Sequence, residues 1–502
     1  MSDNQQPVID FLADPATHGG SPVKRIDTHA ASVFLTGQRA LKIKRAVRFP
    51  FLDFSTLDKR KAACEAEIEV NRLYAPAIYR GVVAITRADG KLAIGGSGEP
   101  VEWAVEMARF DETQTLDHLA ENGRIDAALA DALGRAVAKA HAAVPVVGDA
   151  GFADTLAEII DQNNGELRAA PDLFAGDEVD ALTVASRGAL ERLRPLLDAR
   201  ERDGCVRRCH GDLHLGNIVS IDGAPVLFDA IEFNPKLATI DVFYDLAFLL
   251  MDLIERDLAA AANAVLNRYL AERNSDSDLD ALAALPLMMS LRAAIRAKVT
   301  AARPHRDAAT EKSARDYFAL ARRLIAPPKP MLVAVGGLSG TGKSVLARTL
   351  ASAIMPLPGA IHLRSDVKRK AMFGVAETER LPASAYAPEV TAKVYPALAA
   401  QARRVLAAGH SAIVDAVFAR PAERDAIAQA ASGARFLGLF LTADLDVRVT
   451  RVGARSGDAS DADAAIALAQ ERYDLGTLDW QEIDASGTPD EALRRGKTGI
   501  GL

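Results

Sequence analysis

The sequence has only three cysteines and no long uninterrupted apolar run. Three cysteines, Cys64, Cys205 and Cys209, are too few for a disulfide framework and fit a reducing compartment. Charged residues break every apolar run well before the roughly 18 residues that a membrane-spanning helix needs. The start, MSDNQQPVIDFLADP, lacks the basic and apolar regions of a signal peptide. We therefore expect a cytoplasmic protein with no membrane partner.

An excess of positive charge is also missing. The chain has 60 Lys and Arg against 67 Asp and Glu, which gives a net charge of −7. This balance argues against a protein that coats nucleic acid, so we expect no nucleic-acid partner. The 502 residues exceed one ordinary hydrophobic core and predict two or three domains. Oligomeric state is not indicated.

The clearest boundary is a proline-rich stretch. Residues 325–330 read IAPPKP, and three prolines in four positions cannot continue a helix. We predict a linker at 326–330 that separates a domain at 1–325 from one at 331–502. The second domain alternates apolar runs such as MLVAV and RFLGLFL with helical stretches. That alternation predicts an α/β domain with a parallel sheet.

The first 325 residues show a different order. Residues 26–110 read as a small mixed sheet, interrupted by one helix at about 56–73. Residues 111–325 are mostly rich in alanine and leucine at helical spacing. A β-rich lobe followed by a larger helical lobe is the order of a bilobal α+β kinase.

A phosphate-binding motif opens the second domain. GLSGTGKS at residues 337–344 fits GxxxxGK[ST] in full, after an apolar run and before a helical one. The glycines let backbone N–H groups curl around phosphates, and the helix N-terminus adds partial positive charge. Lys343 would reach the β- and γ-phosphates of ATP, and Ser344 would ligate Mg²⁺. The predicted ATP-binding residues are Gly337, Ser339, Gly340, Thr341, Gly342, Lys343 and Ser344.

Two carboxylates follow apolar runs in this domain. Asp415, after SAIV, has the form that backs a magnesium site. Asp366, after AIHLRS, could accept the proton of a substrate hydroxyl, and Arg369 could hold the acceptor or a phosphate. The alternative is that Asp366 is only a helix N-cap.

Three arginines share one helix face in this domain. Arg448, Arg451 and Arg455 lie at i, i+3 and i+7. Such a face could neutralise charge on the transferred phosphoryl group, with Arg451 and Arg455 as catalytic candidates. The alternative is a solvated arginine face. The region as a whole resembles the P-loop small-molecule kinases, which include gluconate kinase, polynucleotide kinase and zeta-toxin-like enzymes; the phosphate-binding motif is specific, and the acceptor-site motif is not.

The first domain carries a second constellation, HGDLHLGN at residues 210–217. Asp212 would orient and deprotonate the acceptor hydroxyl, while Asn217 and Asp229 would hold Mg²⁺ against the ATP phosphates. The pattern HGDxHxxN resembles the aminoglycoside phosphotransferase and choline-kinase-like family over about residues 26–320. Asp245 resembles a structural carboxylate of that family and is expected to brace the loop.

That resemblance implies a lysine on a small-lobe strand, paired with a helix glutamate. Lys42 and Lys44 lie two apart in ALKIK and so share one strand face. Lys42 fits the family form better. The helix KRKAACEAEIEVNRL offers Glu65, Glu67 and Glu69, of which we choose Glu67.

The resemblance also implies an adenine-reading hinge, which Glu106 and Met107 resemble. The usual Gly-rich loop is absent, because AASVFLTG stands at residues 30–37. The phosphate clamp of this domain therefore stays unassigned. Farther along, Arg292 and Arg296 lie four apart on one helix face, where late helices of this fold wall the acceptor pocket. They would favour an anionic acceptor; the alternative is a surface basic helix.

Taken whole, the chain resembles bacterial fusions of an aminoglycoside phosphotransferase-like domain with a P-loop kinase domain. The hypothesis is a small-molecule kinase, using ATP and Mg²⁺ at two sites, that phosphorylates a sugar, polyol or related metabolite. One alternative is a single kinase with a regulatory nucleotide-sensing P-loop domain. Another is a toxin–antitoxin or signalling kinase that acts on a protein.

Overall fold

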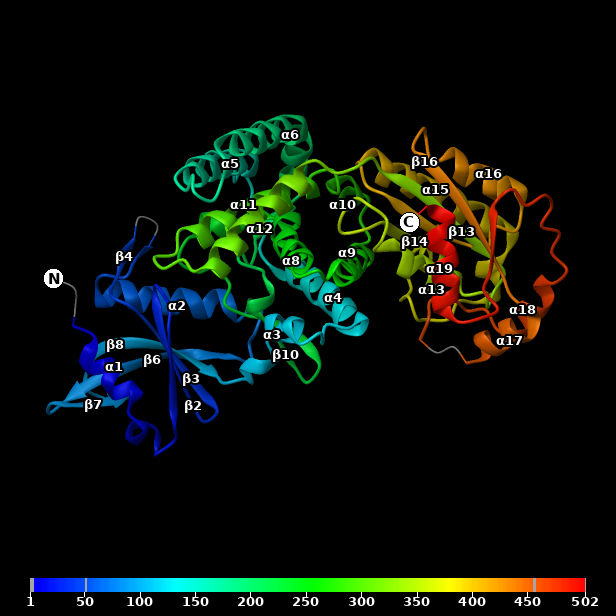
Figure 1. Ribbon diagram of the computed structural model, residues 1–502. Coiled ribbons are helices and arrows are strands. Elements are labelled where there is room, and N and C mark those ends of the chain that lie inside the picture. Colours follow the sequence, from blue (N-terminus) through cyan, green and yellow to red (C-terminus); the bar gives the residue numbers. More distant parts are fainter. Residues whose placement is uncertain (1–3, 50–51, 455–456, 502) are drawn as a thin grey trace. The chain divides into compact units, whose positions relative to one another are not determined.

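The computed structural model describes residues 4–49, 52–454 and 457–501 (Figure 1). It divides into two compact units. The first comprises the described residues of Met1–Glu158 and Arg194–Asp252, and the second comprises those of Ile159–Leu193 and Leu253–Leu502. Three helices run from one unit into the other: α5 (Phe152–Arg168), α6 (Gly176–Arg202) and α8 (Val242–Glu255).

The first unit contains a six-stranded sheet in the order β1-β2-β3-β8-β6-β7. Its strands are β1 (Val23–Asp27), β2 (Ala31–Thr36), β3 (Arg39–Lys44), β6 (Tyr79–Ala88), β7 (Lys91–Ile94) and β8 (Glu99–Ala108). Every neighbouring pair is antiparallel, so the expected mixed sheet is not found in the described residues. The reason is connectivity: tight turns join β1 to β2, β2 to β3 and β6 to β7, and a tight turn reverses the chain.

Two helices pack on this sheet. Helix α1 (Gln6–Ala13) buries Val8 and Leu12 against Leu41 and Ile43 of β3. Helix α2 (Leu57–Asn71) packs on β8 and β6, and it starts where the Thr56 hydroxyl accepts a hydrogen bond from the Lys59 N–H. Because side chains alternate along a strand, Lys42 and Lys44 face away from the side that Leu41 and Ile43 face. That alternation places the lysines of β3 on the α2 side.

The remaining elements of the first unit include the strands that flank the loop with HGDLHLGN. The remaining strands are β4 (Arg48–Phe49), β5 (Leu52–Asp53), β9 (Val206–Arg208), β10 (Ile218–Ile221), β11 (Ala224–Leu227) and β12 (Thr239–Asp241). Helices α3 (Leu116–Glu121), α4 (Ala127–Ala143) and α7 (Pro235–Ala238) accompany them. The loop that carries HGDLHLGN runs between β9, which pairs with β12, and β10, which forms a hairpin with β11.

The second unit contains helices and a parallel sheet. The helices before the sheet are α9 (Ala259–Arg273), α10 (Asp276–Ala281), α11 (Leu285–Ala301) and α12 (Ala308–Ile325). The sheet has the order β14-β15-β13-β16-β17, with β13 (Met331–Gly337), β14 (Ile361–Arg364), β15 (Ala412–Asp415), β16 (Arg435–Thr442) and β17 (Gln481–Asp484). All of its neighbouring pairs are parallel. The later helices are α13 (Lys343–Ala351), α14 (Ser365–Met372), α15 (Pro388–Ala407), α16 (Pro421–Gln429), α17 (Leu445–Gly453), α18 (Ala464–Gln470) and α19 (Pro489–Ile500).

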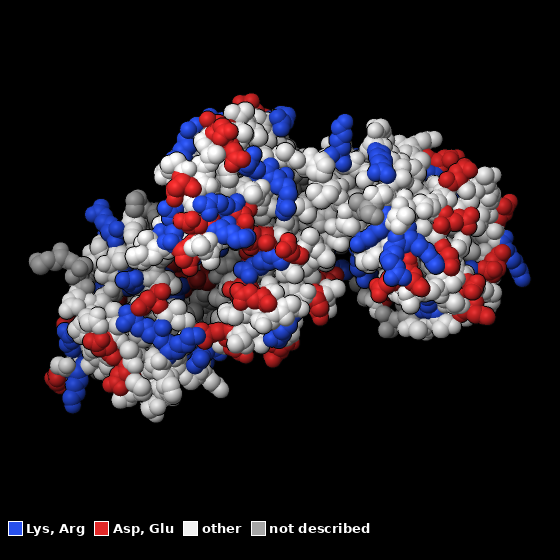
Figure 2. All heavy atoms as spheres, in the orientation of Figure 1, with Lys and Arg blue, Asp and Glu red and all other residues white. Residues whose placement is uncertain are grey.

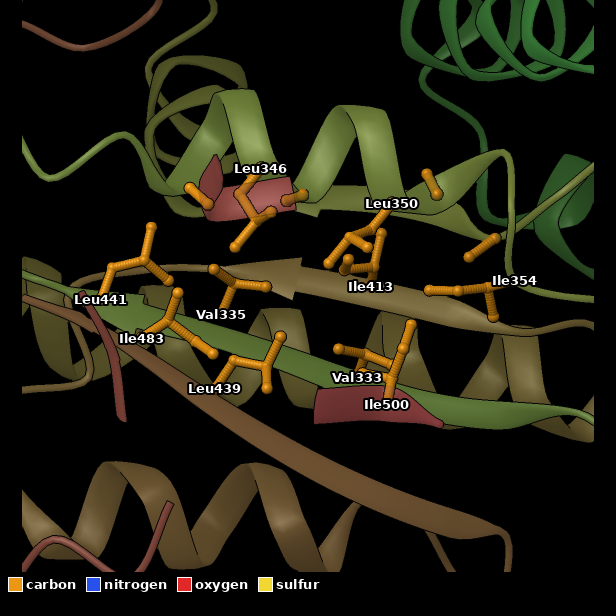
Figure 3. Packing of buried hydrophobic residues seen from close by; sticks show 14 of the residues in the cluster. Val333, Val335, Leu346, Leu350, Ile354, Ile413, Leu439, Leu441, Ile483 and Ile500 are labelled. Carbon is orange, nitrogen blue, oxygen red and sulfur yellow. The ribbon is translucent and has the colours of Figure 1, made fainter. Parts of the chain in front are cut away.

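One face of the parallel sheet packs against α13 and α19 (Figure 3). Val333 and Val335 of β13 meet Leu346 and Leu350 of α13 in a buried cluster. A parallel sheet is covered by helices, so its central strand reads as a nearly continuous apolar run. This core fixes the start of α13, where the phosphate-binding motif ends.

The predicted fold class is confirmed: a sheet lobe with a helical lobe, then a P-loop domain with a parallel sheet. Residues 326–330 lead from α12 directly into β13, and both elements belong to the second unit. The proposed domain boundary there stays a prediction.

Among the described helices, none is long and apolar enough to cross a membrane. Lys and Arg intermingle with Asp and Glu on the face drawn in Figure 2.

We expect Leu350→Ala to lower the free energy of unfolding of the P-loop domain by about 2–5 kcal/mol, because it leaves a cavity in the core. Urea unfolding of a Trp103→Phe background, followed by the fluorescence of Trp480, reports on this part of the chain. The matched control is Leu468→Ala, since Leu468 is 53% exposed. Equal midpoints for the two variants would contradict the prediction.

Candidate active sites

A buried ion pair organises the first site. Lys42 on β3 donates to Glu67 of α2 over 2.9 Å and to Asp229 over 2.7 Å. Burial by itself would lower the pKa of Lys42, but the two carboxylates outweigh it and raise the pKa well above its usual value. Lys42 is therefore a fixed cation beside Asp229. A cation held in this way can meet the phosphates of a nucleotide.

A second lysine shares the same glutamate. Lys44 forms an ion pair with Glu67 over 2.5 Å and a second one with Glu232. Burial would raise the pKa of Glu67, but Lys42 and Lys44 together lower it. Two lysines two residues apart thus bracket one carboxylate, which fixes α2 against β3.

Asp212 and Asn217 lie together on the central loop. The Asn217 side-chain amide donates to both the backbone carbonyl and the carboxylate of Asp212, at 3.0 Å each. The Asp212 side chain keeps 42% of its surface exposed, and the Nε2 atom of His214 lies 3.5 Å from its Oδ2. A partly exposed carboxylate held in place by an amide can accept a proton from a bound hydroxyl.

Helix α8 braces this loop with two buried carboxylates. Asp245 accepts hydrogen bonds from the N–H groups of His210 (3.1 Å) and Gly211 (2.9 Å), and Asp252 accepts from that of Leu215 (2.9 Å). Asp245 thus contacts the loop backbone as expected. Asp252 lies two helical turns farther along the same face and extends the brace.

The hairpin of β10 and β11 brings Asn217 and Asp229 to the same end. Its register pairs Ile218 with Leu227, so the residues just outside the hairpin stand opposite each other. The Phe228 N–H donates to the Asn217 carbonyl over 2.9 Å, and Asp229 follows with a left-handed φ of 61°. The Asp229 N–H in turn donates to the Tyr79 hydroxyl over 3.0 Å. The two metal-ligand candidates of this site are therefore neighbours.

A cavity of about 230 Å³ opens beside Lys42 and Asp229. Apolar residues on one face of the sheet line it, together with Phe228 just after β11: Val33, Leu35, Ala40 and Met107. Thr28, in the turn between β1 and β2, also lines it. An apolar slot that ends in a lysine and a carboxylate suits a purine with phosphates attached.

The hinge candidates differ in their surroundings. Met107 lines the cavity, whereas the Glu106 side chain forms ion pairs with Arg39 over 3.1 Å and Arg80 over 3.8 Å. Their part in reading adenine stays a prediction. Acceptor binding by Arg292 and Arg296 also stays a prediction. Arg292 is buried in α11, and Arg296 stacks on the Tyr317 ring at 5.5 Å.

The second site starts at the phosphate-binding loop. Gly340 has a φ of +87°, and a Cβ there would meet the Arg448 carbonyl oxygen at 2.5 Å, so only glycine fits. Gly342, also left-handed, directly precedes α13 and turns the helix N-terminus toward the loop. The Lys343 ammonium donates to the Leu338 carbonyl over 3.2 Å, which holds it across the loop. The arrangement presents backbone N–H groups and one cation to an anion.

Asp415, at the end of β15, lies beside the loop. Its Oδ1 accepts from the Ser344 hydroxyl over 3.2 Å, and its Oδ2 contacts His362 Nε2 at 2.6 Å. The Nε of Arg364 is 3.7 Å from the same oxygen. Burial would raise the pKa of Asp415, but His362, Arg364 and Lys343 lower it to about 2. Asp415 is thus a carboxylate anion over the whole physiological pH range.

Asp366 is the second residue of α14, which begins at Ser365 with Arg364 in the N-cap position. The alternative of an N-cap role for Asp366 therefore does not apply. Burial and the charge of Asp415 raise the pKa of Asp366, against the lowering effect of Lys343 and of a hydrogen bond with Ser460. One turn on, the buried Arg369 donates to the Ala385 carbonyl over 2.7 Å and stacks on the Tyr386 ring at 4.8 Å.

The predicted arginine face has mixed surroundings. Arg448 is buried and donates to the Ser339 carbonyl of the phosphate-binding loop over 2.9 Å. Arg451 donates to the carbonyls of Ala485 and Gly487, at 2.8 and 2.7 Å. Its catalytic role stays a prediction. Arg455 lies outside the described residues.

The oxygen donors of both sites fit a hard divalent cation. Mg²⁺ prefers carboxylate, amide and hydroxyl oxygens. Asn217 and Asp229 supply such oxygens in the first site, and Ser344 and Asp415 converge within 3.2 Å in the second. The site residues therefore suit Mg²⁺.

Comparison with known proteins relates both sites to families. Residues 53–285 match the phosphotransferase enzyme family, and residues 332–474 match the AAA domain. Uncharacterized protein Rv2004c of Mycobacterium tuberculosis is 30% identical over 483 residues, which cover 93% of this chain and 93% of that protein. The chain belongs to the same family. Protein Mb2027c of Mycobacterium bovis matches to the same extent.

The chain thus carries two kinase-family domains, which confirms the predicted resemblance and the general class of ATP-dependent phosphotransferase. Among solved structures, a choline/ethanolamine kinase family protein from Mesorhizobium loti is 20% identical, with a TM-score of 0.39, and the match covers 64% of this chain and 95% of that one. A gluconokinase from Sinorhizobium meliloti is 20% identical, with a TM-score of 0.25, over 34% of this chain and 92% of that one.

Several residues of these sites escaped the sequence analysis. Glu232, Asp252 and His362 have no motif of their own. A weak signal existed for Glu232, which follows Asp229 by three residues, and for Asp252, which follows Asp245 by seven on a helix. His362 is two residues before Arg364 on one strand and carried no signal beyond that spacing.

We expect Glu67→Gln to reduce phosphoryl transfer at the first site at least 10-fold and to destabilise the first unit by about 3–5 kcal/mol, because two buried lysines lose a shared carboxylate. Steady-state kinetics and thermal unfolding measure the two effects. The controls are Glu65→Gln and Glu69→Gln on the same helix, which should behave as wild type. If either control matched Glu67→Gln, the choice of glutamate would be wrong.

Proposed function

We propose that the protein is a bifunctional ATP-dependent phosphotransferase that phosphorylates a hydroxyl of a small metabolite at each of two sites. One observation carries the proposal: each site combines a fixed lysine and oxygen ligands for phosphate-bound metal with a separate carboxylate that can take a proton. In the first site the lysine and proton acceptor are Lys42 and Asp212. In the second they are Lys343 and Asp366.

At the first site, the adenine occupies the apolar cavity, and Lys42 holds the phosphates. Asn217 and Asp229 would hold Mg²⁺, which supplies charge neutralisation on the β- and γ-phosphates when bound. Asp212 accepts the proton of the acceptor hydroxyl as its oxygen forms a bond to the γ-phosphorus. The bond between that phosphorus and the bridging oxygen breaks, and ADP leaves with the electron pair.

At the second site, the N–H groups of residues 337–344 and Lys343 hold the phosphates. Ser344 and Asp415 would hold Mg²⁺. Asp366 is the proton acceptor, and a raised pKa makes it a better base than an ordinary aspartate. Low and raised pKa values of two nearby carboxylates, Asp415 and Asp366, support a division between a metal ligand and a base.

We propose a sugar, a polyol or a related metabolite as the acceptor, with an anionic group favoured. At the second site the support is Arg369, whose buried guanidinium is stacked on Tyr386 one turn from Asp366. Arg292 and Arg296 are the candidates that would bind an anionic group of the acceptor at the first site. An aminoglycoside is a polycation and would be disfavoured beside such arginines.

The proposal separates into two single substitutions. Asp212→Asn should lower ATP turnover at the first site by about 10²–10⁴-fold, and Asp366→Asn should do so at the second, because each removes a general base. ATP consumption by the full chain over a metabolite library measures both. Each variant should keep the activity that the other one loses. If Asp366→Asn left all turnover unchanged, the P-loop domain would be a sensor and not a kinase.

We also expect a pH dependence that comes from Asp366. A base works only when deprotonated, so turnover at the second site falls as the pH drops through the pKa of Asp366. Because that pKa is raised, the loss begins at a higher pH than for a carboxyl of the usual value of 3.8. The profile of kcat/KM against pH in an Asp212→Asn background measures it. Ser460→Ala removes a hydrogen bond that lowers the pKa, so its acid limb should shift to higher pH; an unshifted limb would speak against Asp366 as the base.

A further inference from the structure

Strand β14 is an edge strand of the parallel sheet, and a helix from the other family match covers it. On its inner side β14 pairs with β15. On its outer side lies α9, which belongs to the residues matched by the phosphotransferase family, whereas β14 belongs to the AAA domain match (Figure 1). Both elements are in the second compact unit. The two families therefore meet at this strand edge.

The contact imitates strand pairing. Asn267 of α9 accepts from the His362 N–H over 2.7 Å and donates to the Ala360 carbonyl over 3.2 Å. Asn263, one turn earlier on α9, donates to the same carbonyl over 3.1 Å. Backbone groups of residues two apart point to the same side of a strand. One carboxamide thus satisfies the N–H and C=O that a sixth strand would have bonded.

The residue held in this way contacts the metal-ligand candidate. The His362 backbone is fixed by Asn267, and its ring contacts Asp415 at 2.6 Å. Asp415 uses its other oxygen to accept from Ser344 over 3.2 Å. A continuous line of direct contacts therefore runs from α9 through His362 to the two oxygen ligands.

A second line of contacts runs in parallel from the next residue of α9. Arg268 donates to Glu377 over 2.7 Å, and Glu377 forms an ion pair with Arg364 over 3.4 Å. Arg364 is 3.7 Å from Asp415 and donates to Asp458 over 2.7 Å. Because His362 and Arg364 are two apart on β14, they point to the same side of the strand, where Asp415 lies.

We infer that Asn267 and Arg268 are positioning residues of the P-loop site: they orient His362 and Arg364, which in turn orient the metal-binding carboxylate Asp415. The inference rests on the proposed metal role of Asp415. Partners that orient a ligand typically change metal affinity or activity by 10–100-fold when removed. Asn267 and Arg268 are one contact farther out, so a smaller effect is expected for them.

The test is a double-mutant cycle on the full chain. Mn²⁺ replaces Mg²⁺, and electron paramagnetic resonance measures its affinity in the presence of a non-hydrolysable ATP analogue. An Asp229→Ala background removes the one carboxylate among the two candidate metal ligands of the first site, so that Mn²⁺ binding reports on the second site. His362→Ala should weaken Mn²⁺ binding about 10–100-fold, and Asn267→Leu about 3–10-fold. If Asn267 acts through His362, the double variant should bind Mn²⁺ within twofold of His362→Ala alone.

Arg404→Gln is the matched control. Arg404 of α15 forms ion pairs with Asp276 and Asp280 of α10, at 2.7 Å each, across the same pair of family matches. Its ion-pair partners lie on α10 and not on β14, so its loss loosens that interface while the contacts of Asn267 and Arg268 stay in place, and Mn²⁺ affinity should stay as in the parent. An equal loss in Arg404→Gln and Asn267→Leu would overturn the inference, because a general loosening would then explain both. So would additive effects of Asn267→Leu and His362→Ala.

Arg268→Gln keeps the inference testable if Asn267→Leu fails to fold, since it leaves the strand edge covered. It should weaken Mn²⁺ binding about 2–5-fold, and the loss should vanish in an Arg364→Gln background. Unchanged Mn²⁺ binding in Arg268→Gln would overturn its role. The proposed function is judged separately, by turnover in an Asp212→Asn chain. A chain with no such turnover but with the Mn²⁺ effects intact would refute the second kinase activity and support the positioning role.

Discussion

A charge that leaves water costs several kcal/mol unless an opposite charge or several hydrogen bonds meet it, and both sites of this protein are arranged by that constraint. In the first site it draws Glu67 between Lys42 and Lys44 and brings Asp229 onto Lys42. In the second it surrounds the buried Asp415 with His362 and Arg364. Since the carboxylate and its cationic partners belong to different elements in each site, pairing these charges also fixes how strand, helix and loop meet.

The same constraint explains which parts of the sites could be predicted. Features that depend on a short stretch of sequence could be predicted from it. The two-residue period of a strand predicted that Lys42 and Lys44 share a face, and the structure places both on Glu67. The spacing of GLSGTGKS predicted a turn into a helix, and α13 begins at Lys343. The period of a strand, the spacing of a motif and the elements that flank it are local properties, so they can be recognised without knowledge of the fold.

Two residues that contact these sites come from far along the chain and left only a weak local pattern. Glu232 reaches Lys44 across 188 positions, and Asp252 reaches the loop at Leu215 from the seventh position after Asp245. The prediction of a mixed sheet was wrong for a related reason. Strand direction depends on how tightly turns connect the strands, and the apolar runs alone do not contain that information. The sequence therefore did not allow us to predict which strands pair in which direction, or which distant side chains form ion pairs.

The contact between α9 and β14 joins the two constraints. An open strand edge carries unpaired N–H and C=O groups, which must be covered or paired. In this chain the cover is Asn267, and the strand it covers also holds His362 and Arg364 against Asp415. The helix that satisfies the backbone thus lies next to the residues that satisfy a buried charge. A strand edge covered in this way makes a helix from the residues matched by the phosphotransferase family part of the structural support of the site in the residues matched by the AAA domain.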